Sequence, residues 1–224
     1  MYRDLAIGVL VAGLAVLPAA FARSEPIKPV ATQVPAGEYR LDPSHASLIF
    51  RVNHLGFSHF TSQFRKFDAT LTLDPKHPER AQVTATIDPR SIEIVDPTLA
   101  VDIQGPQWFD STKFPQMTFR STRVQLTGPN TARITGDLSL RGVTLPVSWD
   151  ATFNGGYAAN PYDPKGARIG FSAHGALKRS AFGMGFGIPA PGTTMGVSDD
   201  VDFTIEAEFN HPAAKPASAN RVKP

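Results

Sequence analysis

Apolar and polar residues alternate with a period of two over several stretches of this chain. A clear example begins at Ala46, where Ala46, Leu48, Phe50 and Val52 occupy every second position. Because successive side chains of a strand point to opposite faces of a sheet, this period predicts half-buried antiparallel strands and an all-β fold. The same alternation recurs over residues 67–73, 83–87, 117–122, 134–140, 143–153, 169–177 and 201–209.

Residues that favour turns separate these strands. Gly, Pro and Asn cluster between the alternating stretches, as tight turns require. The predicted turns are 54–57, 128–130, 141–142 and 154–156. Two more glycines, Gly136 and Gly175, stand on the apolar faces of predicted strands. Glycine at such positions indicates a sharply bent sheet or the close approach of another group.

One stretch breaks the alternation and predicts a short helix. Asp96 is a good N-cap, and Pro97 suits the first helical position. We expect a helix over residues 98–104 that ends at Gly105 and Pro106. Many antiparallel strands with one short helix fit a closed barrel or a sandwich, and the pattern by itself does not choose between them.

The two ends of the chain differ from the alternating region. Arg3 precedes an apolar run over residues 5–17, which is shorter than a membrane span, and residues 20–22 form a small-x-small cleavage site. We expect residues 1–22 to be a cleaved signal peptide, with an uncleaved membrane anchor as the alternative. The remaining expected divisions are a flexible leader at 23–37, one domain at 38–210 and a disordered tail at 211–224.

Composition limits the chemistry that the protein can perform. The net charge of +2 is too small to indicate a nucleic-acid partner. The chain has no cysteine, which excludes disulfides, thiolate zinc sites and a cysteine nucleophile. The fold must therefore be stabilised by its apolar core.

Several short motifs, in their order and spacing, resemble the YceI family of bacterial secreted proteins. The similarity covers about Tyr39 to Phe209. The motifs are residues 39–45, 54–57, 66–68, 108–110, 114–121, 136–147, 179–184 and 198–201. This resemblance implies an antiparallel lipocalin-like β-barrel of about eight strands with one short helical insertion, located in the periplasm.

The resemblance also implies a ligand. An eight-stranded barrel is either filled by its own side chains or just wide enough for one slender ligand. The family binds polyisoprenoids, which implies non-enzymatic binding, and transport or storage, of an isoprenoid quinone or a prenyl phosphate. A self-packed core of Phe, Leu and Val is the alternative. The ligand-binding residues we expect are Phe50, Val52, His54, Phe67, Leu71, Phe109, Phe119, Leu138, Trp149, Phe171, Phe182 and Met184.

Two other functions have weaker support. His45, His54 and His59 could handle a metal or haem, but alternation places His45 and His54 on opposite faces, so we expect no metal and no cofactor. Asp42, Ser44 and His45 could form a hydrolase triad only if neighbours in one strand converged, which alternation opposes. Because the chain also lacks a Gly-x-Ser-x-Gly motif, we expect no enzyme.

The loop at residues 182–197 mixes Gly, Met, Phe, Ile and Pro. Loops of this length are often functional, and we interpret this one as an apolar flap at a barrel mouth, with an ordinary surface loop as the alternative. Its run of glycines at 183–187 lacks the strand and helix that a dinucleotide loop needs. Transient contact with a membrane and a homodimer are both compatible with the sequence.

Overall fold

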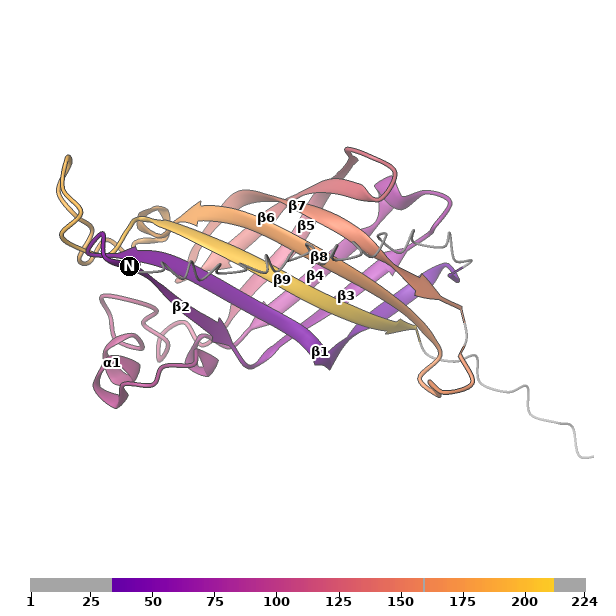
Figure 1. The fold of residues 1–224 in the computed structure, drawn as a ribbon, viewed down its shortest axis with the longest axis horizontal. Coiled ribbons are helices and arrows are strands. Elements are labelled where there is room, and N and C mark those ends of the chain that lie inside the picture. The colour runs from indigo at the N-terminus through magenta and orange to yellow at the C-terminus, as the bar shows by residue number, and fades with distance from the viewer. Residues whose placement is uncertain (1–33, 159, 212–224) are drawn as a thin grey trace, which may run out of the picture.

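The computed structural model describes residues 34–158 and 160–211, which form one antiparallel sheet of nine strands. β9 pairs with β1 and closes this sheet into a barrel (Figure 1). The strands are β1 (Gly37–His54), β2 (Ser58–Phe64), β3 (Phe67–Leu73), β4 (Gln82–Ile87), β5 (Met117–Leu126), β6 (Thr131–Leu140), β7 (Val143–Tyr157), β8 (Ala167–Lys178) and β9 (Asp200–His211). The helical segments are α1 (Pro97–Asp102) and the 3₁₀ helices η1 (Pro78–Arg80), η2 (Pro89–Ser91) and η3 (Arg179–Phe182). No helix in the described part of the chain is long and apolar enough to cross a bilayer.

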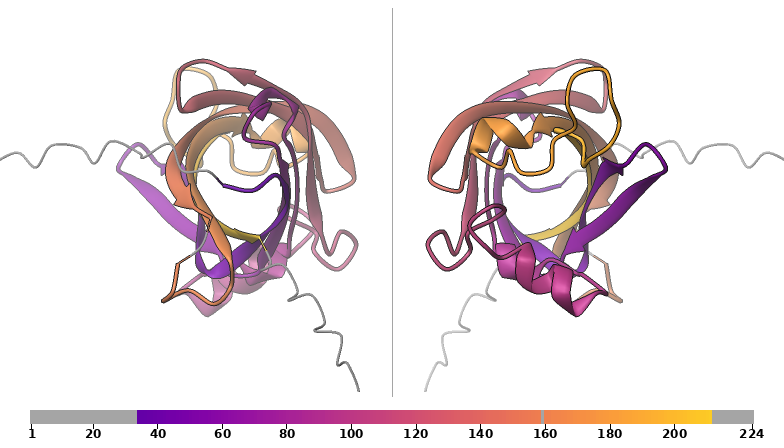
Figure 2. Two further views of the ribbon diagram at one scale, coloured as in Figure 1. Left: turned by 90° about the vertical axis from the view of Figure 1, so that its right-hand side faces the viewer. Right: turned by 90° about the vertical axis from the view of Figure 1, so that its left-hand side faces the viewer.

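The barrel has eight strand positions, because β2 and β3 share one edge of β1. β3 pairs with residues 37–40 of β1, and β2 pairs with residues 48–54. Only Arg65 and Lys66 separate β2 from β3, so the two act as one interrupted strand. Viewed along its axis, the sheet forms a ring with α1 beside it (Figure 2). The predicted antiparallel barrel of about eight strands with one short helical insertion is confirmed.

The two ends of the barrel carry different connections (Figure 1). α1, the turns at 55–57 and 141–142 and the connection at 179–199 lie at one end, which we name the α1 end. The connections at 74–81 and 127–130 lie at the opposite end, with the start of β1 and the end of β9.

Three β-bulges reset the alternation of side chains. They lie between Leu41 and Ala46 in β1, between Ser121 and Arg123 in β5, and between Phe153 and Gly155 in β7. The extra residues, one each in β5 and β7 and three in β1, shift the following side chains to the other face. In β5, the side chains of 124 and 126 therefore line the interior, although the alternation that begins at residue 117 predicts the opposite.

The predicted turns and helix are largely present. Arg141 and Gly142 both have positive φ, as a tight hairpin turn requires. The Asp96 carboxylate accepts hydrogen bonds from the backbone N–H groups of Thr98 and Leu99, at 2.7 and 3.1 Å, and so caps α1. The helix ends at Asp102, two residues before the predicted end.

The predicted turn at residues 154–156 is wrong, since these residues lie inside β7. A bulge there places Gly156 beside β8, where a Cβ atom would lie only 2.5 Å from the Arg168 carbonyl oxygen. Glycine is needed at this position for close approach of two strands, not for a turn.

The glycines on the inward faces also allow close approach. A Cβ at Gly175 would lie 2.6 Å from the Phe203 ring, and a Cβ at Gly136 would overlap the ring of Phe119. Both rings pack in line with Trp149, whose centroid lies 4.1 Å from that of Phe119 and 5.8 Å from that of Phe203. The missing side chains therefore make room for an aromatic row inside the barrel.

The boundaries predicted for the leader and the tail need correction. Val34, placed in the flexible leader, is 6% exposed and packs with Tyr39 and Phe209. Its apolar side chain covers the opposite end of the barrel, and no alternation around it signals this role. His211, placed in the tail, belongs to β9 and pairs with Ala167. The predicted signal peptide and the rest of the tail lie outside the described residues.

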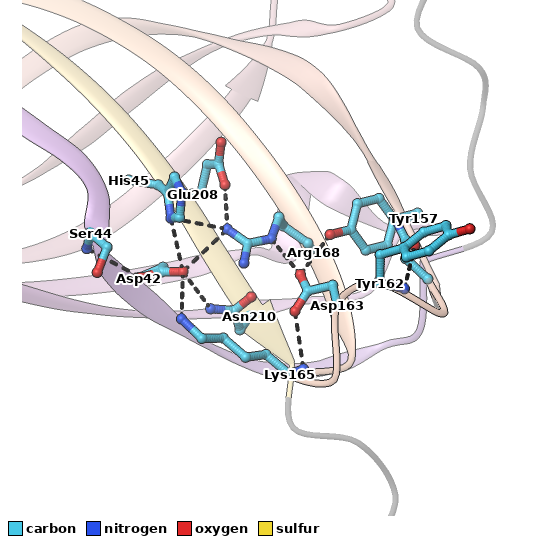
Figure 3. A network of polar contacts seen from close by, with 11 residues as sticks. Asp42, Ser44, His45, Tyr157, Tyr162, Asp163, Lys165, Arg168, Glu208 and Asn210 are labelled. Atoms are coloured by element: carbon cyan, nitrogen blue, oxygen red, sulfur yellow. Dashed lines mark hydrogen bonds and ion pairs between the residues drawn. The ribbon is translucent and has the colours of Figure 1, made fainter.

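A polar cluster joins β1, β8, β9 and the connection between β7 and β8 (Figure 3). At its centre is Asp42, whose side chain is 1% exposed. Its carboxylate accepts hydrogen bonds from Lys165 at 2.9 Å and from Asn210 at 3.3 Å, and it lies 3.2 Å from the Arg168 guanidinium. Arg168 also donates to Asp163, at 2.8 Å, and to Glu208.

These contacts determine the charge states in the cluster. Burial by itself would raise the pKa of the Asp42 carboxyl, but hydrogen bonds from Lys165, His45, Asn210 and Ser44 hold that pKa well below its usual range. Hydrogen bonds from Tyr157 and Arg168 similarly lower the pKa of Asp163 to about 2. Asp42 therefore stays ionised and ties the seam of the barrel, where β1 meets β9, to the β7–β8 connection.

We predict that Asp42→Asn lowers the free energy of unfolding by about 3 kcal/mol at pH 7, because it leaves Arg168 and Lys165 without their shared counter-charge. Lys165 is half-exposed, which keeps the loss at the lower end of the range for buried pairs. Because the folded-state pKa is depressed, this contribution is present above the unfolded pKa of about 3.9 and fades as the pH falls below it. Urea unfolding at pH 7 and pH 3 measures both effects.

Asp137→Asn is the matched control for this prediction. Asp137 is exposed on β6 and forms no ion pair within the described residues. Its loss should change stability by less than about 0.5 kcal/mol. Equal losses in the two variants would mean that the Asp42 cluster does not stabilise the seam.

Candidate ligand-binding cavity

A cavity of about 1170 Å³ lies inside the barrel. Side chains from all nine strands line it, together with Leu99 of α1 and residues 103, 108 and 109 of the segment that follows. Ligand pockets in proteins usually measure roughly 300–1,000 Å³, so this one is large for a single small molecule. The barrel is therefore not filled by its own side chains.

The wall of the cavity is almost entirely apolar. The described residues that line it include no Asp, Glu or Lys, and Arg179 is the single Arg among them. His54, Ser58 and Arg179 lie at the α1 end, whereas Asn130 and Thr131 are polar but neutral and lie at the opposite end. The two ends therefore differ in charge, with a long apolar wall between them.

Aromatic rings form much of this wall. The row of Phe119, Trp149 and Phe203 is followed toward the opposite end by Phe171, which packs against Phe153 at 5.4 Å and Phe209 at 6.1 Å between centroids. Such rings bury large apolar areas with little flexibility. The interior is thus a cavity whose apolar wall is formed by aromatic rings on strands rather than on loops.

Two arginines tie down the loops of the α1 end. Arg179, on η3, is 3% exposed and donates to the carbonyl oxygens of Ser198, Met184 and Val197, at 2.9, 2.6 and 2.8 Å. Arg141 donates to the Pro106 carbonyl oxygen at 2.6 Å and to that of Gly183. These bonds fix the connection at 183–198 against the barrel, so the predicted flap is tethered at both of its ends.

The structure places all but one of the predicted binding residues on the cavity wall. They are Phe50, Val52, His54, Phe67, Leu71, Phe109, Phe119, Leu138, Trp149, Phe171 and Met184. Phe182 is outside the lining: it is 2% exposed and belongs to a core cluster that includes Leu140. The structure shows that the other residues line the cavity, and their contact with a ligand stays a prediction.

Some lining residues were not predicted from the sequence. Phe203 and Ile205 of β9 line the cavity but were not among the predicted set. Arg179 and Trp108 were also missed, and the Arg179 guanidinium lies 5.0 Å from the Trp108 ring centroid. The sequence could have predicted Arg179. The odd-numbered residues of β8 face inward, and Arg179 is the next odd-numbered residue after Leu177.

The histidines do not gather. His54 lines the cavity, His45 hydrogen-bonds to Asp42 outside it at 3.1 Å, and His59 is exposed. Within residues 34–158 and 160–211, no group of three or more His, Cys, Asp or Glu side chains is arranged to hold a metal ion.

The prediction that Asp42 and His45 do not converge is wrong. Strand alternation separates such neighbours, but the bulge in β1 breaks the alternation and brings Asp42 and His45 together. Ser44 donates its backbone N–H to the Asp42 carboxylate at 3.2 Å. This carboxylate also contacts Lys165 and Arg168, so the pair is part of the polar seam, away from the cavity.

Comparison with known proteins agrees with this geometry. A family model described as a YceI-like domain matches residues 39–209. A UPF0312 protein of Pseudomonas putida strain W619 is 35% identical over 180 residues, which cover 80% of this chain and 88% of the relative.

Two solved structures extend the comparison. BcnA of Burkholderia cenocepacia superposes with a TM-score of 0.63 at 26% identity, over 75% of this chain and 98% of that one. A polyisoprenoid binding domain from Saccharophagus degradans gives a TM-score of 0.59 at 12% identity, over 80% and 100% of the two chains, which is a likeness of fold alone. With its barrel, its motifs and these relatives, the chain belongs to the family of YceI-like domains.

Proposed function

We propose that this protein binds a polyisoprenoid lipid inside its barrel, without catalysis, and carries or stores that lipid in the periplasm. The observation that supports this proposal is the apolar cavity of about 1170 Å³. The chain shares its fold with a polyisoprenoid binding domain, which agrees with the same ligand class.

The driving force would be burial of the lipid tail. Each methylene group removed from water contributes about 0.8 kcal/mol, so a long prenyl chain gains well over 10 kcal/mol in total. Ordering of the chain and loss of free motion offset much of this gain. A rigid aromatic wall limits the ordering cost on the protein side, because its side chains are already in place.

The composition of the wall favours binding over catalysis. General acid–base and nucleophilic chemistry need converging polar groups in the pocket. The described lining residues include His54 and Ser58, which pair at the β1–β2 turn, but no Asp or Glu that could orient His54 as a general base. The polar seam around Asp42 lies outside the cavity. The geometry therefore supports a carrier more than a hydrolase.

Loading of such a lipid requires transient contact with a membrane. Phe57 and Met195, at the α1 end, are 80% and 67% exposed and offer apolar side chains near one end of the cavity. These residues support the membrane contact in the proposal. A homodimer stays a prediction of the sequence.

We expect protein purified from the periplasm of a bacterial host to contain a prenyl lipid. Mass spectrometry of an organic extract measures it, with an extract of an unrelated periplasmic protein as the control. If delipidated protein also fails to take up any prenyl lipid from vesicles, the proposal is wrong.

Ala69→Trp tests whether the lipid occupies the barrel. Ala69 lines the cavity and faces Ala85 across the β3–β4 ladder, so an indole has space to enter. We expect a folded variant with a melting temperature near that of delipidated wild type and with little lipid. Ala176→Trp is the control, because Ala176 is exposed on β8, and it should retain lipid.

A different outcome would favour a self-packed interior. Overpacking a filled core usually costs about 1–3 kcal/mol. A strongly destabilised Ala69→Trp protein, made from a parent that carries no lipid, would contradict the carrier proposal.

Export is the remaining element of the proposal. We expect cleavage after Ala22, because the small-x-small site follows a short apolar run. N-terminal sequencing of the periplasmic protein should find Arg23 as its first residue. A mature chain that still begins at Met1, held in the membrane fraction, would favour the anchor alternative.

A further inference from the structure

The start of the described chain folds into the end of the barrel opposite α1. Val34 is 6% exposed, lines the cavity and packs in one core cluster with Leu73 and Phe209. In the view onto this end, the indigo start of the chain crosses the opening of the ring (Figure 2). An apolar side chain that precedes the first strand therefore lies where the cavity reaches the mouth of the barrel.

Two features of the sequence hold the chain in this position. Gly37 has a φ of +150°, which other residues rarely adopt, and a Cβ atom there would lie 2.5 Å from Cε1 of His211. The Tyr39 hydroxyl donates a hydrogen bond to the Pro35 carbonyl oxygen at 2.6 Å. Tyr39 is fully buried, and this burial raises the pKa of its phenol, so the hydroxyl stays a neutral donor. Val34 is thus fixed in the mouth by the residues that follow it.

The rim around Val34 is stiff. Three of the residues that line the cavity at this end are prolines, whose rings fix φ. They are Pro75, Pro78 and Pro129. The turn between β5 and β6 is tied to β7, because the Phe153 N–H donates to the Asn130 carbonyl oxygen at 2.7 Å. A mouth built in this way does not widen easily, so a side chain placed in it restricts what can pass.

We infer that Val34 is a stop that limits the length of the lipid tail that the barrel can hold. An isoprenoid tail that enters at the α1 end follows the aromatic wall and meets Val34 where the cavity ends. Tails that end before Val34 are enclosed, whereas longer tails leave isoprene units in water. This inference rests on the proposed function and concerns the length of the tail, whatever the chemistry of the head group.

The test is a competition among prenols that share one head group and increase in length from farnesol to solanesol. Delipidated protein is incubated with phosphatidylcholine vesicles that contain all members in equal amounts, and mass spectrometry compares the bound prenols with those in the vesicles. A tail that fits exchanges one apolar environment for another, so all members up to the limit should bind about equally. The next longer member should bind at least ten-fold less, because each methylene left in water weakens binding about four-fold.

Two substitutions at Val34 should move this limit in opposite directions. Val34→Gly should admit tails at least one isoprene unit longer, whereas Val34→Trp should exclude the longest member that wild type binds. Val197→Gly is the matched control, because Val197 also lines the cavity from a connection between strands, but at the α1 end. This control should leave the limit unchanged.

A role in packing alone would give a different result. Val34 variants that lose prenols of every length equally, or that keep the limit of wild type, would overturn the inference. A limit that moves with Val197→Gly instead would lie at the α1 end and would also overturn it. If the Val34 variants fail to fold, wild type decides, since uptake that does not fall between farnesol and solanesol would mean that no stop exists. Failure to take up any prenol would defeat the proposed function itself.

Discussion

The pairing of β1 with β9 is the interaction on which the rest of this structure depends. It joins the first and last strands of the described chain and removes the free edges that an open sheet would expose. Closure at eight strand positions also fixes the width of the interior, which is then just large enough for one slender ligand. The bulge in β1 at this seam places Asp42 where it can bind β8, β9 and the β7–β8 connection, so the seam is held by charge as well as by the backbone ladder.

The interior stays open because small residues lie beside bulky ones, or opposite other small ones, on neighbouring strands. Gly136 and Gly175 leave room for the rings of Phe119 and Phe203, which would otherwise meet a Cβ atom. Small Ala69 faces small Ala85 on the neighbouring strand. Apolar area is therefore concentrated on the wall and not at the axis. Such a surface gains free energy when an apolar chain covers it, which agrees with the proposed binding of a lipid.

Charge is distributed unequally between the two ends. Outside the cavity, near the opposite end, Asp42 and Asp163 are paired with Arg168 and Lys165 in a cluster that closes the seam. At the α1 end, Arg141 and Arg179 donate to loop carbonyls, and Arg179 brings an unpaired charge to the cavity wall. The first arrangement pairs opposite charges, whereas the second uses neutral carbonyl oxygens as acceptors. The two ends of the cavity therefore differ in charge.

Period-two alternation predicts the strands and most of the cavity wall, because it reports which side chains face inward. Local residue types predict the helix cap at Asp96, and short motifs carry the resemblance to YceI-like proteins. The alternation did not determine where bulges interrupt that period. Three features depend on pairing with distant strands. They are the inward-facing side chains of residues 124 and 126, the convergence of Asp42 with His45, and the position of residues 154–156 inside β7. The burial of Arg179, with no carboxylate partner among the described residues, also depends on tertiary contacts. Its hydrogen-bond acceptors belong to residues 184, 197 and 198, and the Trp108 ring, far away in the sequence, lies 5.0 Å from its guanidinium. An alternating pattern predicts the face of the sheet on which a side chain lies. The residues that this side chain contacts depend on closure of the whole sheet.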